Sequence, residues 1–303
     1  MSLPPVNVPD SKLPGKALVL GGLNGLLGRG ITAALTKAGV EVMAVSSAQL
    51  DYFDADALDD FLDEHEPDCL INAVGYTQVD QAEDAPEDAY RLNAALPALL
   101  GELAVDFGIR LVHFSTDFVF DGAKRTPYLP TDSTNPLSVY GASKLAGEDT
   151  LLALDLPDLL ILRTAWLFGP GKMNFVRRML DLAAERPELK VVNDQFGSPT
   201  YTEDLAELTV ALLRNGAAGV LHAADAGQAT WHELASAAIE LAGLPCTVAP
   251  IPTSGYPTRA KRPPYSVLDL ADTARAAGYM PRHWREALAE YVAEYAHETK
   301  ASA

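Results

Sequence analysis

The chain has 303 residues, of which 48% are hydrophobic and 21% are charged, and its formal net charge is −18. This profile indicates a globular protein with one large α/β domain, or with a nucleotide-binding domain and a smaller lobe. The negative charge argues against a nucleic-acid partner, and no apolar run reaches the roughly 20 residues of a membrane span. Two cysteines without metal-ligand spacing fit a reducing cytoplasm.

The proline-rich start, residues 1–15, is predicted to be a disordered lead-in. Short apolar runs that predict buried strands then follow at residues 16–21, 41–45, 69–74, 110–115 and from 160. Segments with helical spacing lie between them at residues 29–38, 54–64 and 86–107. This alternation predicts a doubly wound parallel sheet of the Rossmann type, whose ligands lie beyond the carboxyl ends of the strands.

The domain boundaries follow from a change in composition. Residues 16–170 are expected to form a dinucleotide-binding domain, which residues 220–224 rejoin as a late strand. In residues 171–303, glycine, proline and aromatic residues are interspersed. We expect this part to form mainly a smaller, loop-rich lobe that closes over a substrate.

Three glycines, Gly22, Gly25 and Gly28, lie directly after the first predicted strand and before the first predicted helix. Glycine here lets the backbone turn tightly and approach a pyrophosphate at the helix N-terminus. The spacing GxxGxxG differs from the more usual GxGxxG, so its position carries the prediction. We expect this loop to bind a dinucleotide, together with its remaining residues Asn24, Leu26 and Leu27.

Ser46 directly follows the second predicted strand, where NAD enzymes typically have a carboxylate; neither a carboxylate nor an arginine is present. A serine can hydrogen-bond either a ribose hydroxyl or a phosphate, so the choice between NADPH and NADH stays open. Asp51 either reaches the adenine or caps the following helix. Tyr52 is placed beside it in the predicted cofactor site.

Tyr140 and Lys144 are four residues apart, a spacing that puts both side chains on one face of a helix. Reduction of a ketone needs a proton donor, and a nearby ammonium lowers the phenol pKa from its usual value of about 10. Ser115 and Thr116, at the end of the fourth predicted strand, offer hydroxyls that can orient the carbonyl oxygen. Together these residues predict a reductase of the short-chain dehydrogenase type.

With these features the chain resembles the extended short-chain dehydrogenase/reductases, and among them the dTDP-4-dehydrorhamnose reductases, over residues 16 to 295. Three matching segments lie in the dinucleotide-binding part: NAVGYTQVDQAE from Asn72, FSTDFVFDG from Phe114 and NPLSVYGASKLAGE from Asn135. Three more distinguish this reductase from epimerases and dehydratases: RTAWLFGPGKMNFVRRML from Arg163, VVNDQFGSPT from Val191 and RPPYSVL from Arg262.

The resemblance implies that Tyr140 donates a proton, Lys144 assists it and Thr116 binds the C4 oxygen. Hydride would pass from NADPH or NADH to C4 of dTDP-4-dehydro-β-L-rhamnose, giving dTDP-β-L-rhamnose. The resemblance extends the cofactor site to Ala73, Val74, Gly75, Asn93 and Ser115. It places the nucleotide-sugar against residues from both halves of the chain: Tyr76, Thr77, Val79, Asp117, Trp166, Asn174, Gln195 and Arg262.

Several of these residues have a purely structural alternative. Trp166 can be a core aromatic residue and Asn174 a helix cap. Arg262, the candidate for the diphosphate, can belong to a surface ion pair that contributes little to stability. Tyr76 and Thr77 either shape the cleft or close a turn.

One position departs from the family pattern. Some members are dimers bridged by a magnesium ion that glutamates hold, one of them two residues beyond the third loop glycine. This chain has Gly30 there. The resemblance therefore does not extend to a metal site, and we predict none; a monomer and a homodimer both stay open.

Two other functions compete with this one. A related nucleotide-sugar reductase or epimerase would use the same residues on another substrate. A non-catalytic regulatory subunit would keep the fold and bind the dinucleotide. The joint presence of Tyr140, Lys144 and Thr116 favours an enzyme, because a regulatory subunit has no need of them.

Overall fold

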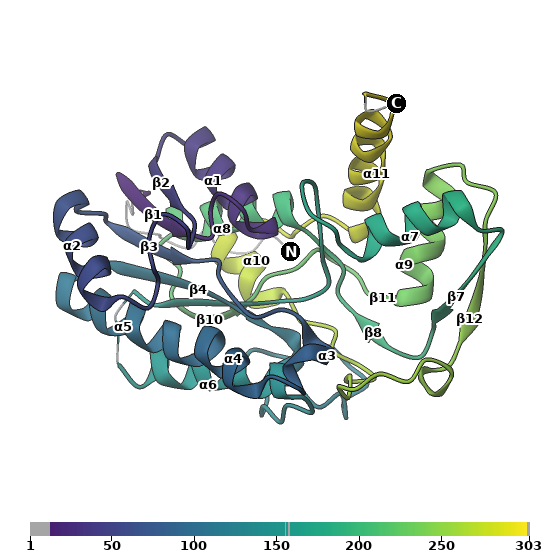
Figure 1. Cartoon of the computed structure of the whole chain (residues 1–303), viewed down its shortest axis with the longest axis horizontal. Coiled ribbons are helices and arrows are strands. Elements are labelled where there is room, and N and C mark those ends of the chain that lie inside the picture. The colour runs from purple at the N-terminus through teal and green to yellow at the C-terminus, as the bar shows by residue number, and fades with distance from the viewer. Residues whose placement is uncertain (1–12, 155, 157, 302–303) are drawn as a thin grey trace, which may run out of the picture.

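The structure, a computed structural model, describes residues 13–154, 156 and 158–301. The predicted disordered lead-in lies outside the described residues as far as residue 12. A six-stranded parallel sheet forms the centre, in the order β10-β5-β4-β3-β1-β2 (Figure 1). Its strands are β1 (Lys16–Leu20), β2 (Glu41–Val45), β3 (Cys69–Asn72), β4 (Arg110–Thr116), β5 (Leu160–Thr164) and β10 (Gly219–His222). The predicted Rossmann-type α/β fold is confirmed.

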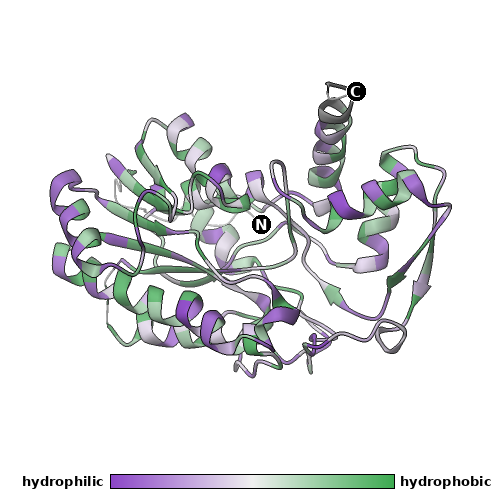
Figure 2. Ribbon diagram, in the orientation of Figure 1, coloured by the Kyte–Doolittle hydropathy of each residue, from purple (hydrophilic) through white to green (hydrophobic). Residues whose placement is uncertain are grey.

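Helices cover both faces of this sheet, as a doubly wound fold requires. One face packs against α1 (Leu26–Lys37), α8 (Thr202–Arg214) and α10 (Ala271–Ala277). The other packs against α2 (Ala55–His65), α5 (Leu96–Phe107) and α6 (Val139–Leu152). Figure 2 shows the consequence: hydrophobic residues concentrate on the central strands, and hydrophilic residues lie on the outer helix faces.

The sequence of β1 explains how one strand serves two cores. Successive residues of a strand point to opposite faces of a sheet. Ala17 and Val19 lie in the core under α1, whereas Leu18 and Leu20 lie in the core under α2 and α5. All four are fully buried. A strand buried on both faces reads as a continuous apolar run, which is how this one could be predicted.

The predicted helix over residues 86–107 is continuous in space but not uniform. It consists of α4 (Pro86–Tyr90), a π-helical turn (Arg91–Ala95) and α5, and it ends at Gly108, whose φ is 63°. A π-helical turn often marks a functional site, because it re-aims the side chains within it. Asn93 lies in this turn and is fully buried.

The smaller lobe has more regular structure than its composition suggested. Its core joins α7 (Phe175–Glu185), α9 (Trp231–Leu241) and α11 (Trp284–Ala301) to a two-stranded parallel sheet of β7 (Glu188–Val192) and β12 (Thr247–Ile251). Short pairs complete it: β6 (Leu167–Phe168) with β9 (Thr200–Tyr201), and β8 (Phe196–Gly197) with β11 (Ala229–Thr230). Between these elements α8, β10 and α10 return to the main sheet.

The strand order of the main sheet contains a topological switch point, where a ligand is expected. From β1 the chain goes to β2 on one side and then crosses to β3 on the other, so the sheet changes direction between β1 and β3. Ligands of open parallel sheets bind beyond the strands at this switch point. Among the described residues, no helix combines the length and apolar character needed to cross a membrane.

Candidate active site

The glycine loop occupies the turn from β1 into α1. Gly25 precedes the first residue of α1 and donates its N–H to Gly21 O at 2.9 Å. A Cβ atom on Gly25 would lie 2.7 Å from the same oxygen, and one on Gly28 would lie 2.2 Å from it. Both positions therefore need glycine, and the start of the helix stays open for the close approach of a pyrophosphate.

Replacing Gly28 by alanine tests this loop. The new methyl group would collide with backbone atoms of Gly21, which cannot move aside as a side chain can. We expect a loss of about 1–3 kcal/mol in stability and NADPH binding weakened roughly tenfold or more, measured by denaturant unfolding and calorimetry. Gly30→Ala is the control, because its Cβ would lie 3.0 Å from the end of the Glu203 side chain and no closer than 3.3 Å to a backbone atom, Thr202 O. Equal NADPH affinity in the two variants would contradict the prediction.

The residues that follow β2 are those predicted to contact the adenosine part of the cofactor. The Tyr52 hydroxyl donates to Val45 O at 3.0 Å and accepts from Gly21 N at 3.1 Å, so it ties the end of β2 to the glycine loop. Ser46 donates its hydroxyl to Gln49 Oε1 at 3.0 Å. The helix cap is Asp54, whose carboxylate accepts from Ala57 N, rather than Asp51. The exposed side chain of Asp51 accepts instead from Phe53 N.

The segment after β3 lies on the other side of the switch point. Asn72 Oδ1 accepts from Val74 N at 3.1 Å, which fixes the turn through Ala73. Asn93 holds the backbone of Tyr76, two residues after Val74: its side chain accepts from Tyr76 N at 2.8 Å and donates to Tyr76 O at 3.1 Å. It also donates to the hydroxyl of Ser143 on α6 at 2.9 Å. The π-helical turn thus fastens residues 73–76 to α6.

Tyr140 and Thr116 meet at the carboxyl end of β4. Helix α6 begins after Ser138, whose hydroxyl accepts from Gly141 N, and this cap puts Tyr140 in the first turn. A hydrogen bond joins the Tyr140 and Thr116 side chains. Burial raises the pKa of Tyr140 to about 12, and this hydrogen bond opposes the rise. The tyrosine is therefore protonated at neutral pH.

Lys144 lies on the same helix as predicted, but its effect on Tyr140 differs from the expectation. Its Nζ donates to Phe114 O at 2.5 Å and lies 3.3 Å from Nε2 of His113. Burial lowers the pKa of Lys144 to about 8, with Glu148 acting in the opposite direction. The expected lowering of the Tyr140 pKa is wrong: Lys144 Nζ points to β4, and burial of the phenol raises the pKa.

A buried ion pair lies behind this group. Arg163 of β5 binds the Glu148 carboxylate of α6 through Nε at 3.0 Å and a terminal nitrogen at 2.6 Å. Both residues are at most 5% exposed. The Ser115 hydroxyl donates to Glu148 Oε1, so this predicted cofactor residue is engaged inside the protein. The pair therefore connects β4, β5 and the helix that carries Tyr140.

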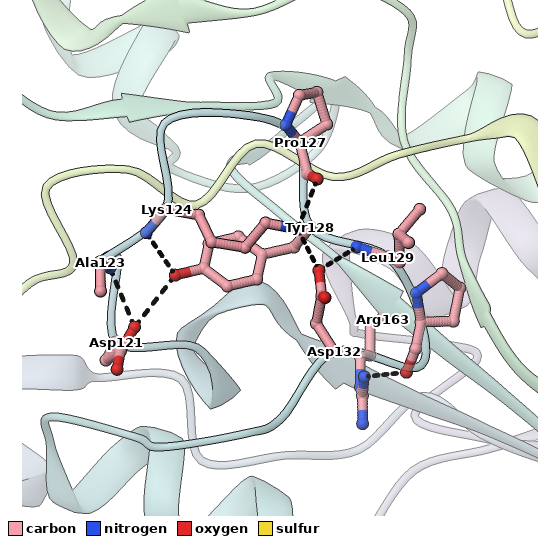
Figure 3. Close-up of polar contacts among 9 residues, drawn as sticks. Asp121, Ala123, Lys124, Pro127, Tyr128, Leu129, Asp132 and Arg163 are labelled. Atoms are coloured by element: carbon pink, nitrogen blue, oxygen red, sulfur yellow. Dashed lines mark hydrogen bonds and ion pairs between the residues drawn. The ribbon is translucent and has the colours of Figure 1, made fainter.

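The loop between β4 and α6 is held by its own side chains (Figure 3). The Tyr128 hydroxyl donates to Asp121 and accepts from Lys124 N. Asp132 accepts from Leu129 N at 2.7 Å and forms an ion pair with Lys124. The Arg163 guanidinium, labelled in Figure 3, also donates to Pro130 O of this loop, at 3.0 Å. The buried ion pair and the loop thus form one connected support.

Asp117 follows Thr116 directly and is only 2% exposed. Its carboxylate accepts from the hydroxyls of Thr116 and Ser266, so it joins the end of β4 to the C-terminal segment. Burial raises the pKa of Asp117 to about 7, and these hydrogen bonds oppose the rise.

This pKa predicts how stability depends on pH. Because the folded-state pKa lies above the unfolded value of about 4, folding favours the protonated form. The resulting stabilisation is present at low pH and is lost as pH rises through about 7. We therefore expect Asp117→Asn to gain stability relative to wild type on going from about pH 5.5 to about pH 8.5 in urea unfolding. The exposed Asp59→Asn should show no such gain, and a parallel response of both variants would refute the prediction.

Two predicted substrate residues belong to an aromatic cluster. Trp166 stacks on Trp231 with ring centroids 3.5 Å apart, and its φ is 47°. Gly197 also lies against the indole, because a Cβ there would be 2.4 Å from it. The Trp231 indole N–H donates to Gln195 Oε1 at 3.1 Å, and Gln195 donates to Thr253 at 3.0 Å. Trp166 and Gln195 are therefore linked through Trp231, a residue that sequence reasoning missed.

The remaining predicted substrate residues differ in their roles. Asn174 caps α7 by accepting from Arg177 N, so the structural alternative describes it. Arg262 forms two hydrogen bonds to Asp80 at 3.0 and 2.7 Å, which lower the pKa of that carboxyl. This ion pair ties the C-terminal segment to α3 (Val79–Ala82), whose first residue is half-buried. Thr77 is exposed.

Residues that sequence reasoning missed share one signal. His113 and Arg163 are polar residues inside strands that are otherwise almost fully buried, and Glu148 is the buried partner of Arg163. A charged residue in an apolar strand such as LILRT needs a partner of opposite charge, so Arg163 indicates a buried carboxylate elsewhere in the chain. Its identity required the three-dimensional structure.

The chain matches known proteins over nearly its whole length. Residues 16–297 match the family described as RmlD substrate binding domain. A dTDP-4-dehydrorhamnose reductase of Mycobacterium tuberculosis is 42% identical over 290 residues, 93% of this chain and 94% of that protein. The crystal structure of such a reductase from Clostridium acetobutylicum has a TM-score of 0.88 and 38% identity, covering 92% of this chain and 99% of that one.

A second solved structure carries a cofactor. The dTDP-4-dehydrorhamnose reductase of Bacillus anthracis, in complex with NADP, has a TM-score of 0.88 at 32% identity, with 93% of this chain and 99% of that chain covered. Sequence and architecture therefore agree along both the sheet and the smaller lobe. The chain belongs to the RmlD substrate binding domain family.

Proposed function

We propose that this chain is an oxidoreductase that reduces the C4 ketone of dTDP-4-dehydro-β-L-rhamnose to dTDP-β-L-rhamnose with NADPH or NADH. One observation carries the proposal: the hydrogen-bonded pair of Tyr140 and Thr116 at the end of β4, within the sheet that also bears the glycine loop. The reductase named for this reaction in Mycobacterium tuberculosis, 42% identical over 93% of the chain, supports it.

The residues at the switch point fit a dinucleotide. The loop from Gly22 to Gly28, with Asn24, would hold the pyrophosphate at the start of α1, because the tight turn that Gly25 and Gly28 make against Gly21 O brings the backbone to the helix N-terminus. Ser46, Asp51 and Tyr52 would lie on the adenosine side. Residues 73–75 and Asn93 would lie on the nicotinamide side. When bound there, the nicotinamide supplies the hydride that the ketone receives.

The side chains at the end of β4 supply the proton. Tyr140 would donate its hydroxyl proton to the C4 oxygen, and its raised pKa keeps that proton available at neutral pH. Thr116 would orient the same oxygen through its hydroxyl. Lys144 would turn from Phe114 O towards the nicotinamide ribose and assist Tyr140. Gly75 leaves room on that side, since a Cβ there would be 3.8 Å from Nζ.

The sugar nucleotide would lie between the sheet and the smaller lobe. We assign residues 16–170 with 220–224 to cofactor binding, and the remainder of 171–303 mainly to the substrate. Tyr76, Thr77, Val79, Asp117, Trp166 and Gln195 would line the cleft. Arg262 would exchange the Asp80 carboxylate for the diphosphate, since both offer paired oxygens to a guanidinium. Asn174 would act indirectly, through the start of α7.

Several features of the whole protein belong to the same proposal. Its two cysteines are free and buried, which fits a cytoplasmic enzyme. We expect a monomer or a homodimer, no nucleic-acid partner and no metal requirement for hydride transfer.

The test follows oxidation of NADPH and of NADH after addition of enzymatically generated dTDP-4-dehydro-L-rhamnose. We expect oxidation with at least one cofactor and dTDP-L-rhamnose as product. A parallel arm uses dTDP-4-keto-6-deoxy-D-glucose, because a Streptomyces niveus reductase named for that substrate is 41% identical over 89% of this chain. Turnover only in that arm would reassign the substrate. Cofactor binding without turnover in either arm would favour a regulatory subunit.

A further inference from the structure

The proposed reaction leaves one buried polar group unused. His113 lies in β4 and is only 1% exposed. Its two ring nitrogens meet different partners: Nδ1 is 3.1 Å from Asn72 Nδ2, and Nε2 is 3.3 Å from Lys144 Nζ. The ring therefore bridges the segment under the cofactor and the lysine of the active site.

Hydrogen-bond direction fixes the tautomer of this ring. Asn72 Oδ1 accepts from Val74 N, so the amide nitrogen, a donor, must face His113. Nδ1 of His113 is then the acceptor. Burial and the nearby Lys144 charge hold the pKa of His113 well below its usual range, so the ring is neutral. A neutral ring that accepts through Nδ1 carries its proton on Nε2, the atom that faces Lys144.

This arrangement affects the two charge states of Lys144 differently. A neutral amine can accept the Nε2–H of His113 while it donates to Phe114 O at 2.5 Å. An ammonium has no lone pair, so two donors would face each other across 3.3 Å. We infer that His113 is a positioning residue that holds Lys144 against β4 and weakens the binding of its proton.

Other charged groups near Lys144 act in known directions. Glu148, one turn further along α6, favours the ammonium, but Arg163 neutralises it from β5. Asp117 follows the end of β4, and Tyr140 lies on α6 one turn before Lys144. The segment from Asn72 to Gly75 contains no charged residue. The charged residue of the π-helical turn, Arg91, has its guanidinium over the Phe53 ring. His113 is thus the contact that distinguishes the two states. The inference deepens the proposed function, because it concerns the lysine assigned there.

The first experiment titrates Lys144 in the ligand-free, full-length protein. The chain carries lysine labelled with carbon-13 at Cε, and a Lys144→Met variant identifies the resonance. In His113→Gln, the amide can turn its oxygen to the ammonium, so we expect the titration midpoint to rise by about one pH unit. His222→Gln is the control, because His222 is also fully buried in the sheet. An unchanged midpoint in His113→Gln would overturn the inference.

The second experiment needs no substitution at His113. Nitrogen-15 spectra of the wild-type histidines report which ring nitrogen carries the proton. We expect the Nε2–H form for His113 from about pH 6 to pH 9; the Nδ1–H form would overturn the inference even if His113→Gln did not fold. Both experiments are independent of turnover, so failure of the reductase assignment leaves them decisive. If the enzyme is active, the pH at which kcat falls on the alkaline side should rise in His113→Gln together with the titration midpoint of Lys144.

Discussion

Replacement of Tyr140 by phenylalanine is expected to lower kcat by on the order of a hundredfold to ten-thousandfold, the range for loss of a general acid. The substitution removes only the hydroxyl that pairs with Thr116 and keeps the ring against Phe118, whose centroid is 5.7 Å away. Folding and cofactor affinity should therefore change little. Steady-state kinetics with the better of the two cofactors, and calorimetry for cofactor binding, measure the two effects separately.

Tyr90→Phe provides a matched control for Tyr140→Phe. Tyr90 is 42% exposed at the end of α4 and is none of the residues assigned to catalysis or binding. This variant should retain the kcat of the wild type. If Tyr140→Phe also retained it, the proton would have to come from another group, and the catalytic role proposed for the end of β4 would be wrong.

The pKa of Tyr140 suits the direction of the reaction. A reductase consumes a proton at each turnover, so its tyrosine must be protonated before the hydride arrives. Burial, which raises this pKa to about 12, secures that state at neutral pH. The sequence pattern YxxxK predicts a lowered tyrosine pKa instead. The spacing shows that both side chains lie on one face of the helix, but not where the lysine side chain points. Phe114 O and His113 decide that direction.

The strands of the main sheet could be predicted because both of their faces are buried. Such strands are short apolar runs, as in β1 and β3, and polar turns separate them from helices. The glycine loop could be predicted for a similar reason, since a backbone approach at Gly28 excludes every side chain. These are local constraints, and the sequence records them locally.

Features that depend on contacts between distant residues could not be predicted in this way. The π-helical turn that aims Asn93 at Tyr76 and Ser143 has no signature in a run such as RLNAA. The return of α8 to the main sheet from within residues 171–303 was also hidden, because its contacts with α1 join segments far apart in the sequence. Arg262 shows the same limit: its pairing with Asp80 joins residues 182 positions apart.

Disruption of the Glu148–Arg163 pair is expected to have the largest effect on stability. Glu148→Gln would leave the Arg163 guanidinium buried without a counter-charge, and a lone buried charge typically costs about 3–5 kcal/mol. Ser115 would also lose its carboxylate acceptor. We expect the free energy of unfolding to fall by that amount in denaturant titrations, and kcat to fall as well, because the pair fixes α6 to β4 and β5.

A surface pair provides the matched control. Lys37 and Glu207 form an ion pair at 2.9 Å, but their side chains are 79% and 60% exposed. Glu207→Gln should therefore cost no more than about 1 kcal/mol. A cost for Glu148→Gln as small as that of the control would show that water or another group compensates Arg163.

The double variant Glu148→Leu with Arg163→Met separates charge burial from the geometry of the support. It removes both charges together, and apolar replacement of a whole buried ion pair is often neutral or even stabilising. We expect it to regain most of the stability that Glu148→Gln loses, although Pro130 O loses the guanidinium donor shown in Figure 3. Its kcat should stay low, since Ser115 and the loop before α6 lose their shared anchor. Recovery of both stability and kcat would show that the pair matters only because each charge needs the other.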